Sequence, residues 1–186
     1  MRLKMTVGKH ILNKQGFHLR AFNITDSEAL FELLNHPEIS PYVPIEILPK
    51  NVFDSIRHIQ KRKQLYSRNE GAYWAICDPH GSLIGTAGFD SWSSINNRYE
   101  IAFELHPRFQ GQGLMTLSLK YITEFGLKTL KATRIQALTL THNHPSMRVL
   151  TRVGFQKEGV LRKYRMFNGK PTDIAMFSIT QNDIQQ

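Results

Sequence analysis

The chemistry suggested by this sequence is centred on one carboxylate and two closely spaced glycines. Glu100 lies in an apolar run that ends at Leu105, and Gly111 and Gly113 follow before a second apolar run begins at Leu114. Glycines allow positive backbone torsions and let an anion approach the main chain, while the first amides of a following helix have no partners within it. The segment therefore predicts a phosphate-binding site between a strand and a helix.

Two familiar phosphate-binding motifs do not fit this segment. A dinucleotide fingerprint needs a third glycine, but Thr116 stands there, and no acidic ribose partner follows about twenty residues on. A nucleotide-triphosphate loop needs Gly-Lys-Ser/Thr, whereas Gly113 precedes Leu114 and Met115. A strand-to-helix turn that holds no ligand remains an alternative, because two glycines alone are a weak signal.

The remaining pattern, Arg108-x-x-Gly111-x-Gly113, resembles the pyrophosphate-binding motif of the GCN5-related N-acetyltransferases. A second signature lies at residues 143–155, which are similar to that family's Asn-x-x-Ser-x-x-Val-x-x-Lys-x-Gly-Phe element, with Arg152 where lysine is common. The opening, residues 17–44, is similar to the ribosomal-protein N-terminal acetyltransferase branch. The resemblance extends to residue 179, although relatives that act on antibiotics, polyamines or metabolites share this opening.

The resemblance implies acetyl-coenzyme A as cosubstrate and no metal. In this family the strand before the glycine turn offers backbone groups to the pantetheine arm, although ordinary strand pairing is the alternative for those residues. Helix capping is the alternative for Asn143, and a surface position is the alternative for Arg152. The expected cofactor-binding residues are Phe103, Glu104, Leu105, Arg108, Phe109, Gln110, Gly111, Gln112, Gly113, Leu114, Met115, Asn143, Ser146 and Arg152.

Direct attack of an amine on a thioester needs a base, a polarised carbonyl and an acid for the leaving thiolate. Glu100 is the first candidate for the base, because it precedes the turn and matches a carboxylate found in this branch. Strand alternation puts Glu104 on the same face, as the second candidate. In some ribosomal-protein acetyltransferases a glutamate before an Asn-Gly hairpin is thought to be the base, but Arg165 stands at that position here, which leaves the role to Glu100 or to water. A surface carboxylate paired with an arginine is the alternative for Glu100.

Ser146 is the expected acid, because related enzymes use the serine of this motif near the coenzyme A sulfur. A polar residue in the first turn of a helix is the equally weighted alternative, and Tyr121 and Tyr164 are further candidates for the acid. His142 and His144 have no third ligand at suitable spacing, so no metal site is expected.

The acceptor is expected to be an amine, with a protein N-terminus favoured. Its contacts should come from residues 39–47 with Tyr42, residues 91–97 with Trp92, and the Asn168-Gly169 turn, although both aromatic residues could be packing residues. An α-amine has a pKa near 8 and needs only a weak base, whereas a lysine near 10.4 needs a stronger one. A small amine or antibiotic as acceptor, or a non-catalytic acyl-coenzyme A-binding module, is the alternative.

The composition suits one domain of 186 residues, with residues 1–16 as an extension and 181–186 as a polar tail. The single cysteine, Cys77, is expected in a buried strand of a cytoplasmic protein, as a monomer or homodimer, and no segment is long enough to span a membrane. The net charge of +9 is spread along the chain without a nucleic-acid motif, so nucleic acid is a disfavoured partner. Its densest cluster, which contains Lys61, Arg62 and Lys63, is expected on the outer face of a helix.

The hydrophobic periodicity predicts an α/β (α+β) fold with helices on both faces of a mixed, mostly antiparallel sheet of about seven strands. The resemblance implies the same single domain of the GNAT type. The expected strands are residues 17–22, 72–78, 82–90, 98–105, 134–140, 155–167 and 173–180, and the expected helices are residues 26–35, 50–66, 112–129 and 145–152.

Overall fold

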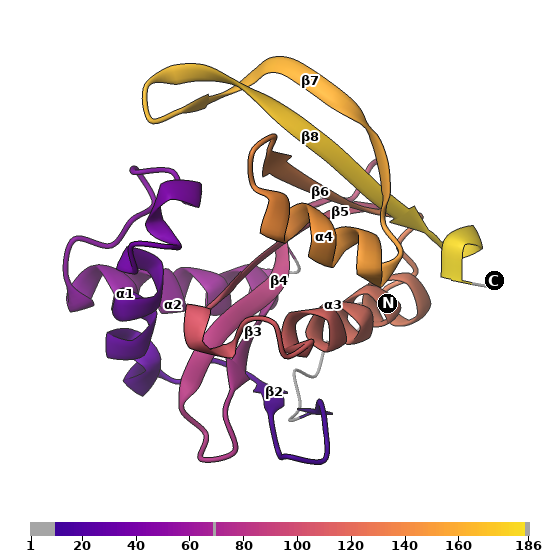
Figure 1. The fold of residues 1–186 in the computed structure, drawn as a ribbon. Helices are drawn as coiled ribbons and strands as arrows, with labels where there is room; N and C mark the ends of the chain where they lie inside the picture. The colour runs from indigo at the N-terminus through magenta and orange to yellow at the C-terminus, as the bar shows by residue number, and fades with distance from the viewer. Residues whose placement is uncertain (1–9, 69, 185–186) are drawn as a thin grey trace.

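The computed structural model of the protein describes residues 10–68 and 70–184, which form one mixed sheet with helices on both faces (Figure 1). The strands follow one another across the sheet in the order β1-β2-β3-β4-β5-β6-β8-β7. They are β1 (His10–Ile11), β2 (His18–Arg20), β3 (Ala72–Cys77), β4 (Leu83–Ser93), β5 (Arg98–Leu105), β6 (Arg134–Leu140), β7 (Gln156–Phe167) and β8 (Lys170–Thr180).

The predicted fold class and all seven predicted strands are confirmed, and β1 is an eighth strand. This two-residue strand pairs with β2 and lies within the predicted extension 1–16, of which residues 1–9 lie outside the described part. Its shortness explains the omission, because two residues carry no periodic signal. The predicted polar tail, 181–186, begins with a 3₁₀ turn at Gln181–Ile184, and its last two residues lie outside the described part.

The four predicted helices correspond to α1 (Ser27–Asn35), α2 (Val52–Arg68), α3 (Leu114–Glu124) and α4 (His144–Val153). The predicted helix 112–129 is split, because a π-helical turn at Phe125–Thr129 continues from α3. Gly126 in that turn packs against Phe89 and Ile135, where an added Cβ would come within 2.7 Å of each side chain. In the described part of the chain, no helix combines the length and apolar composition that crossing a bilayer requires.

Each face of the sheet carries its own hydrophobic core. The core under α3 and α4 includes Trp74, Phe89 and Leu119, while the core under α1 and α2 includes Leu30 and Ile59. The predicted burial of Cys77 on β3 is confirmed, since its side chain is fully buried in the second core. Because both faces are covered, the sheet is held rigidly between two helical layers.

The strands β5 and β6 form the parallel pair of the sheet, and this pair is short. Only three register pairs join them, and the last is Glu100 with Gln136. Beyond it, β5 continues to Leu105 and β6 continues to Leu140, and no pairing joins their distal halves. The two strands therefore diverge, and a gap opens in the middle of the sheet.

Glu158 ties the last three strands together. Its carboxylate accepts two hydrogen bonds of 2.6 Å from Arg134 on β6 and one of 2.6 Å from Ser178 on β8. The Arg134 guanidinium, followed by the Ser178 hydroxyl, lowers the pKa of Glu158 from 4.5 to about 2. Since the pair is partly exposed, its contribution to stability is reduced by solvent screening.

We expect Glu158→Gln to lower the free energy of unfolding by about 1 kcal/mol near neutral pH. A carboxylate with a depressed folded-state pKa stabilises the fold fully above its unfolded value, here 4.5, and loses that effect as the pH falls toward about 2. Urea unfolding of both proteins should therefore show a difference above pH 4.5 that disappears near pH 2. Glu124→Gln, which breaks an exposed pair with Lys128, is the control and should change stability little. A difference that does not vary with pH would contradict the assignment.

Candidate active site

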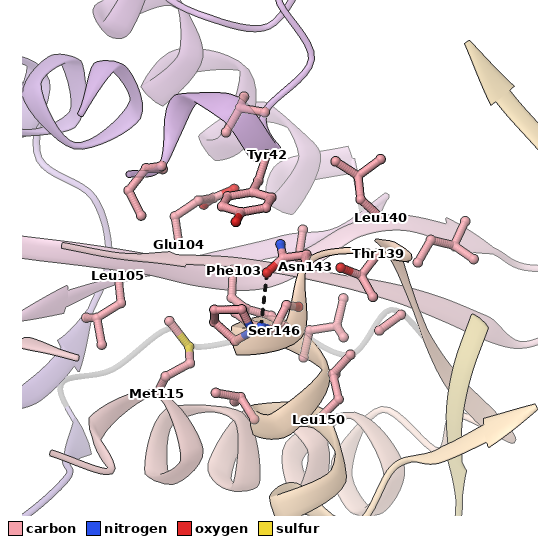
Figure 2. A pocket seen from close by; sticks show the side chains of 18 of the residues that line it. Tyr42, Phe103, Glu104, Leu105, Met115, Thr139, Leu140, Asn143, Ser146 and Leu150 are labelled. Atoms are coloured by element: carbon pink, nitrogen blue, oxygen red, sulfur yellow. Dashed lines mark hydrogen bonds between the residues drawn. The ribbon is translucent and has the colours of Figure 1, made fainter. Parts of the chain in front are cut away.

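A cavity of about 780 Å³ passes through the gap between β5 and β6. Its walls come from α3 and α4 on one face of the sheet and from residues 37–47 with α2 on the other. Figure 2 shows this arrangement, with Tyr42 and Glu104 on one side of β5 and Met115 and Leu150 on the other. A ligand in the cavity could therefore contact both faces of the sheet.

The glycine turn lies at one end of this cavity. Gly111 and Gly113 both have left-handed backbone conformations, with φ of +75° and +76°, and Gly113 is the N-cap of α3. A Cβ added to either glycine would meet nothing within 4 Å, so space is open above the turn. Because the first amides of a helix lack partners within it and carry the positive end of the dipole, this turn has the chemistry of an anion site.

The backbone of β5 faces the gap at alternate residues. His106 donates its amide hydrogen to Ile84 on β4, at an N···O distance of 2.8 Å. Strand alternation then directs the peptide groups of Leu105 and Phe103 to the opposite edge, toward β6. The Leu105 carbonyl indeed accepts a hydrogen bond of 3.0 Å from the Gln110 side chain rather than from β4. The diverging strand thus leaves an edge that an extended ligand could join.

Asn143 and Ser146 begin α4 at the opposite wall. The Asn143 side-chain oxygen accepts a hydrogen bond of 3.1 Å from the Ser146 amide, which is an N-cap. Because the side-chain oxygen of Asn143 faces the Ser146 amide, the NH₂ group of Asn143 points the other way, toward the side of Tyr42 (Figure 2). The Ser146 hydroxyl lines the cavity and makes no hydrogen bond with residues 10–68 or 70–184. Capping is thus present, and it leaves both polar groups available to a ligand.

The two candidate bases, Glu100 and Glu104, both line the cavity and have different partners. Glu100 accepts a hydrogen bond of 3.0 Å from Gln136 and forms an ion pair of 3.5 Å with Arg165. Glu104 accepts a bond of 2.5 Å from the Thr86 hydroxyl. Four residues of strand place the Cα atoms of the two glutamates about 13 Å apart, and their carboxylates have no partner in common.

A wall of charged and aromatic side chains, which the sequence did not reveal, closes the α2 side of the cavity. Arg62 lies over the rings of Tyr73 and Phe22, 4.4 and 5.4 Å from their centroids. The expectation that Arg62 faces outward was therefore wrong; Lys61 and Lys63 are exposed. Helical positions one apart differ by 100°, so an arginine between two exposed lysines can turn toward the sheet.

Tyr73 in this wall donates a hydrogen bond of 2.9 Å to Asp90 on β4. Burial, followed by the charge of Asp90, raises the pKa of the Tyr73 phenol well above its usual value, so the phenol keeps its proton. The sequence signals for this pair are weak. Tyr73 lies within β3, which is buried throughout, and Asp90 follows the buried part of β4.

Residues 39–47, which we call the cover loop, reach across the α1 side of the cavity. The ring of Tyr42 lies 5.9 Å from that of His142, in the turn between β6 and α4. The Ile45 amide donates a hydrogen bond of 2.9 Å to the side-chain oxygen of Asn168, in the β7–β8 turn. The cover loop is thus joined to two segments that are distant in the chain, because Tyr42 and His142 are 100 residues apart and Ile45 and Asn168 are 123 apart.

The charges of the lining residues differ between the two ends of the cavity. The charged side chains from α4 are Arg148 and Arg152, which suit phosphate groups. On the other face of the sheet, Arg62 and Arg165 are outnumbered by carboxylates, namely Glu38, Asp90, Glu100 and Glu104. This distribution favours an anionic ligand at the α4 end and a cationic group near β5.

Most of the expected site residues lie together in this cavity, and five of the sequence candidates do not line it. The cofactor candidates in the lining are Phe103, Glu104, Leu105, Phe109, Gln110, Gly111, Gly113, Leu114, Met115, Asn143, Ser146 and Arg152, together with Tyr42 and Glu100. Arg108 and Gln112 lie on the outer side of the glycine turn, with Gln112 bonded to the Arg108 carbonyl. Trp92 stacks on Tyr99, Tyr121 stacks on His10, and Tyr164 is exposed on β7.

The chain is similar to known acetyltransferases along most of its length. Residues 17–156 match the family model described as an acetyltransferase (GNAT) domain. The uncharacterized N-acetyltransferase YoaA of Bacillus subtilis (strain 168) is 33% identical over 172 residues, which cover 92% of this chain and 97% of that protein.

Two further similarities concern a ribosomal-protein enzyme and a solved structure. The ribosomal protein uS5-alanine N-acetyltransferase of Escherichia coli (strain K12) is 28% identical over 123 residues, or 64% of this chain and 63% of that protein. The structure of Mycobacterium smegmatis RimJ in complex with CoA-disulfide has a TM-score of 0.82 at 20% identity, covering 91% of this chain and 84% of that chain. This last similarity shows that the two proteins share a fold.

We expect Asn168→Gly to release the cover loop. Glycine retains the left-handed backbone of this position, where φ is +49°, but removes the oxygen that binds the Ile45 amide. Hydrogen exchange of the Ile45 amide should therefore become faster, by about three- to ten-fold for a hydrogen bond of ordinary strength. Asn168→Asp is the matched control, because its carboxylate can accept the same bond. Equal exchange in all three proteins would show that the bond does not restrain the loop.

Proposed function

Since the chain belongs to the GNAT acetyltransferase family and is an N-acetyltransferase, we propose that it transfers the acetyl group of acetyl-coenzyme A to the N-terminal amine of a protein. One observation carries this proposal. The cavity passes through the gap between β5 and β6, with an anion seat on one side and carboxylates on the other. A cofactor and an amine could thus approach one point from opposite faces of the sheet.

The residues at the α3 side fit coenzyme A. The open space at Gly111 and Gly113 and the first amides of α3 would bind its pyrophosphate, with Arg152 as a further cation. The peptide groups of Phe103 and Leu105 would bond to the pantetheine arm as a neighbouring strand does. Acetyl-coenzyme A supplies an activated acetyl thioester when it is bound.

Glu100 is the base in this proposal. An arm held at the glycine turn and running along Leu105 and Phe103 extends toward Glu100, where the gap closes. The Arg165 and Gln136 side chains hold the Glu100 carboxylate at this point, where it would take a proton from the amine directly or through water. A carboxylate is a weak base, which suits an α-amine with a pKa near 8 better than a lysine near 10.4.

The backbone of β5 and Ser146 would carry out the other two steps, which are polarisation of the thioester carbonyl and protonation of the leaving sulfur. A peptide N–H of β5 that faces the gap would polarise the carbonyl as the amine attacks it. The Ser146 hydroxyl would donate a proton to the sulfur as the carbon–sulfur bond breaks, and Asn143 would orient the start of α4. Among the hydroxyl candidates from the sequence, Ser146 is favoured because it lines the cavity, whereas Tyr121 and Tyr164 do not.

A protein acceptor is supported by the relatives and by the charge at the acceptor end. The Escherichia coli relative is named for the acetylation of an alanine of ribosomal protein uS5. Carboxylates outnumber arginines beside Tyr42, which suits a cationic α-amine. A cytoplasmic location, favoured by the single cysteine, belongs to the same proposal.

A small amine is the second candidate acceptor, and one contact favours it. The bond between Ile45 and Asn168 joins the cover loop to the β7–β8 turn beside Pro44 and Phe167, which line the acceptor side of the cavity. A polypeptide would need this bond to open, whereas a small amine would not.

We expect Gly113→Ala to weaken binding of coenzyme A by about ten-fold or more. A methyl group would occupy the space above the turn and would disfavour the positive φ of this position. Isothermal titration calorimetry with coenzyme A measures the effect. Gly81→Ala is the matched control, because Gly81 also has a positive φ, +91°, and open space around it, but lies in the β3–β4 turn outside the cavity. Equal affinity of the two variants for coenzyme A would contradict the assignment of the glycine turn as its pyrophosphate site.

We expect the protein to acetylate peptides with a free N-terminus, and Glu100→Gln to lower kcat about a hundred-fold near neutral pH. The deficit should shrink above about pH 8, because the acceptor amine then loses its proton to solvent. Release of free thiol from acetyl-coenzyme A measures the rate. Glu104→Gln is the control, because it changes the other carboxylate on the same strand face.

Three outcomes of this experiment would count against parts of the proposal. Turnover with small amines and none with peptide N-termini would overturn the protein acceptor. A larger loss in Glu104→Gln than in Glu100→Gln would move the base to Glu104. Binding of acetyl-coenzyme A without turnover of any acceptor would favour a non-catalytic module.

A further inference from the structure

The outer strand β7 carries a wide bulge beside the cavity. Leu161 pairs with Ile174 and Arg165 pairs with Thr172, so four steps along β7 match two steps along β8. The two extra residues push positions 162–164, which we call the 162–164 bulge, away from the ladder. Lys163 at its centre has a left-handed backbone with φ of +50°, and its amide donates a hydrogen bond of 2.8 Å to Asp173.

The 162–164 bulge presents two cations and an aromatic ring to solvent. Arg162 and Lys163 are exposed, and the Tyr164 side chain is 55% exposed. No ion pair of Arg162 or Lys163 occurs within residues 10–68 and 70–184. A left-handed backbone is disfavoured for a residue with a Cβ, so the bulge holds Lys163 in a strained conformation. The bulge therefore interrupts the pairing of β7 with β8 and leaves the positive charges of Arg162 and Lys163 exposed to solvent.

The bulge lies next to the acceptor end of the cavity. Arg165, which directly follows it, lines the cavity and forms the ion pair with Glu100. Lys163 lies two residues before Arg165 on β7, so about 7 Å of strand separates their Cα atoms. Starting from an amine at Glu100, an extended polypeptide would reach the bulge after about three residues. Figure 1 shows the β7–β8 hairpin arching above the rest of the sheet, with β7 as its edge strand.

A polypeptide with acidic side chains is the occupant that this surface favours. The bulge interrupts the edge of β7, so an added strand, including β7 of a second copy, could not pair along it. A second copy would also bring Arg162 and Lys163 against their own counterparts. Nucleic acid is less favoured, because the flanking exposed residues Val160 and Met166 are apolar and the patch holds only one stacking ring.

We propose that the 162–164 bulge is a docking site for acidic side chains near the N-terminus of the acceptor polypeptide, and thus selects acceptors with glutamate or aspartate at about the third or fourth position. This inference rests on the proposed function, because it assumes that the acceptor is a polypeptide N-terminus. The bulge acts on substrate binding and takes no part in the chemical step.

The test compares two short peptides that both start with alanine and differ only in having two glutamates or two glutamines at the third and fourth positions. At low salt the wild-type protein should turn over the acidic peptide with a kcat/KM about three- to ten-fold higher, through KM. In Arg162→Gln/Lys163→Gln this preference should disappear, while turnover of the neutral peptide stays unchanged and shows that the variant is folded. Salt should weaken the preference in the wild type.

Lys61→Gln/Lys63→Gln is the matched control. It likewise removes two positive charges, from exposed positions of α2 that do not line the cavity, and should retain the preference. Equal turnover of both peptides by the wild type would overturn the docking site and leave the proposed function standing. No turnover of either peptide would overturn the proposed function itself.

Binding of labelled single-stranded RNA, followed by fluorescence anisotropy, tests the other class of partner. The proposal expects the bulge variant and the α2 variant to lose RNA affinity to the same small extent, because they lose the same charge. A loss confined to the bulge variant, with an unchanged peptide preference, would overturn the proposal in favour of a nucleic-acid contact.

Discussion

The divergence of β5 from β6 is the constraint on which the rest of this structure depends. Three register pairs join the strands, and beyond Glu100 and Gln136 the peptide groups of Phe103 and Leu105 face a gap inside the sheet. Buried peptide groups require partners. An open edge in the middle of a sheet is therefore a binding surface. It also connects the two faces of the sheet, so a cofactor on one side can meet an acceptor on the other.

Each neighbouring element contributes to the use of this gap. The glycine turn and the start of α3 give one wall an anion seat, and the capped start of α4 supplies Ser146 with a free hydroxyl. The α1–α2 side supplies Tyr42 and a protonated Tyr73. The β7–β8 hairpin then contributes three features to one opening: Arg165 beside Glu100, the bond from Asn168 to the cover loop, and the exposed bulge. In the proposed function, acceptor selection is therefore concentrated in the hairpin.

Much of the fold could be predicted from the sequence, because periodicity and turn residues are local signals. The seven longer strands, four helices and two-layer covering all follow from such signals, whereas β1 is too short to give one. The outward orientation expected for Arg62 was wrong, because its neighbours Lys61 and Lys63 gave the segment a polar appearance. The attraction of a guanidinium to the Phe22 and Tyr73 rings depends on strands that lie elsewhere in the chain.

The sequence by itself determined the family, the order of the elements and the glycine turn that we propose as the phosphate site, because each rests on residues close together in the chain. Only the tertiary structure decided which charged groups meet. Glu100 and Arg165 are 65 residues apart, and Ile45 and Asn168 are 123 apart. Contacts at such separations depend on strand register and crossover, which local residue spacing does not encode. The same reason explains the bulge, since its extra residues are visible only when β7 is aligned with β8.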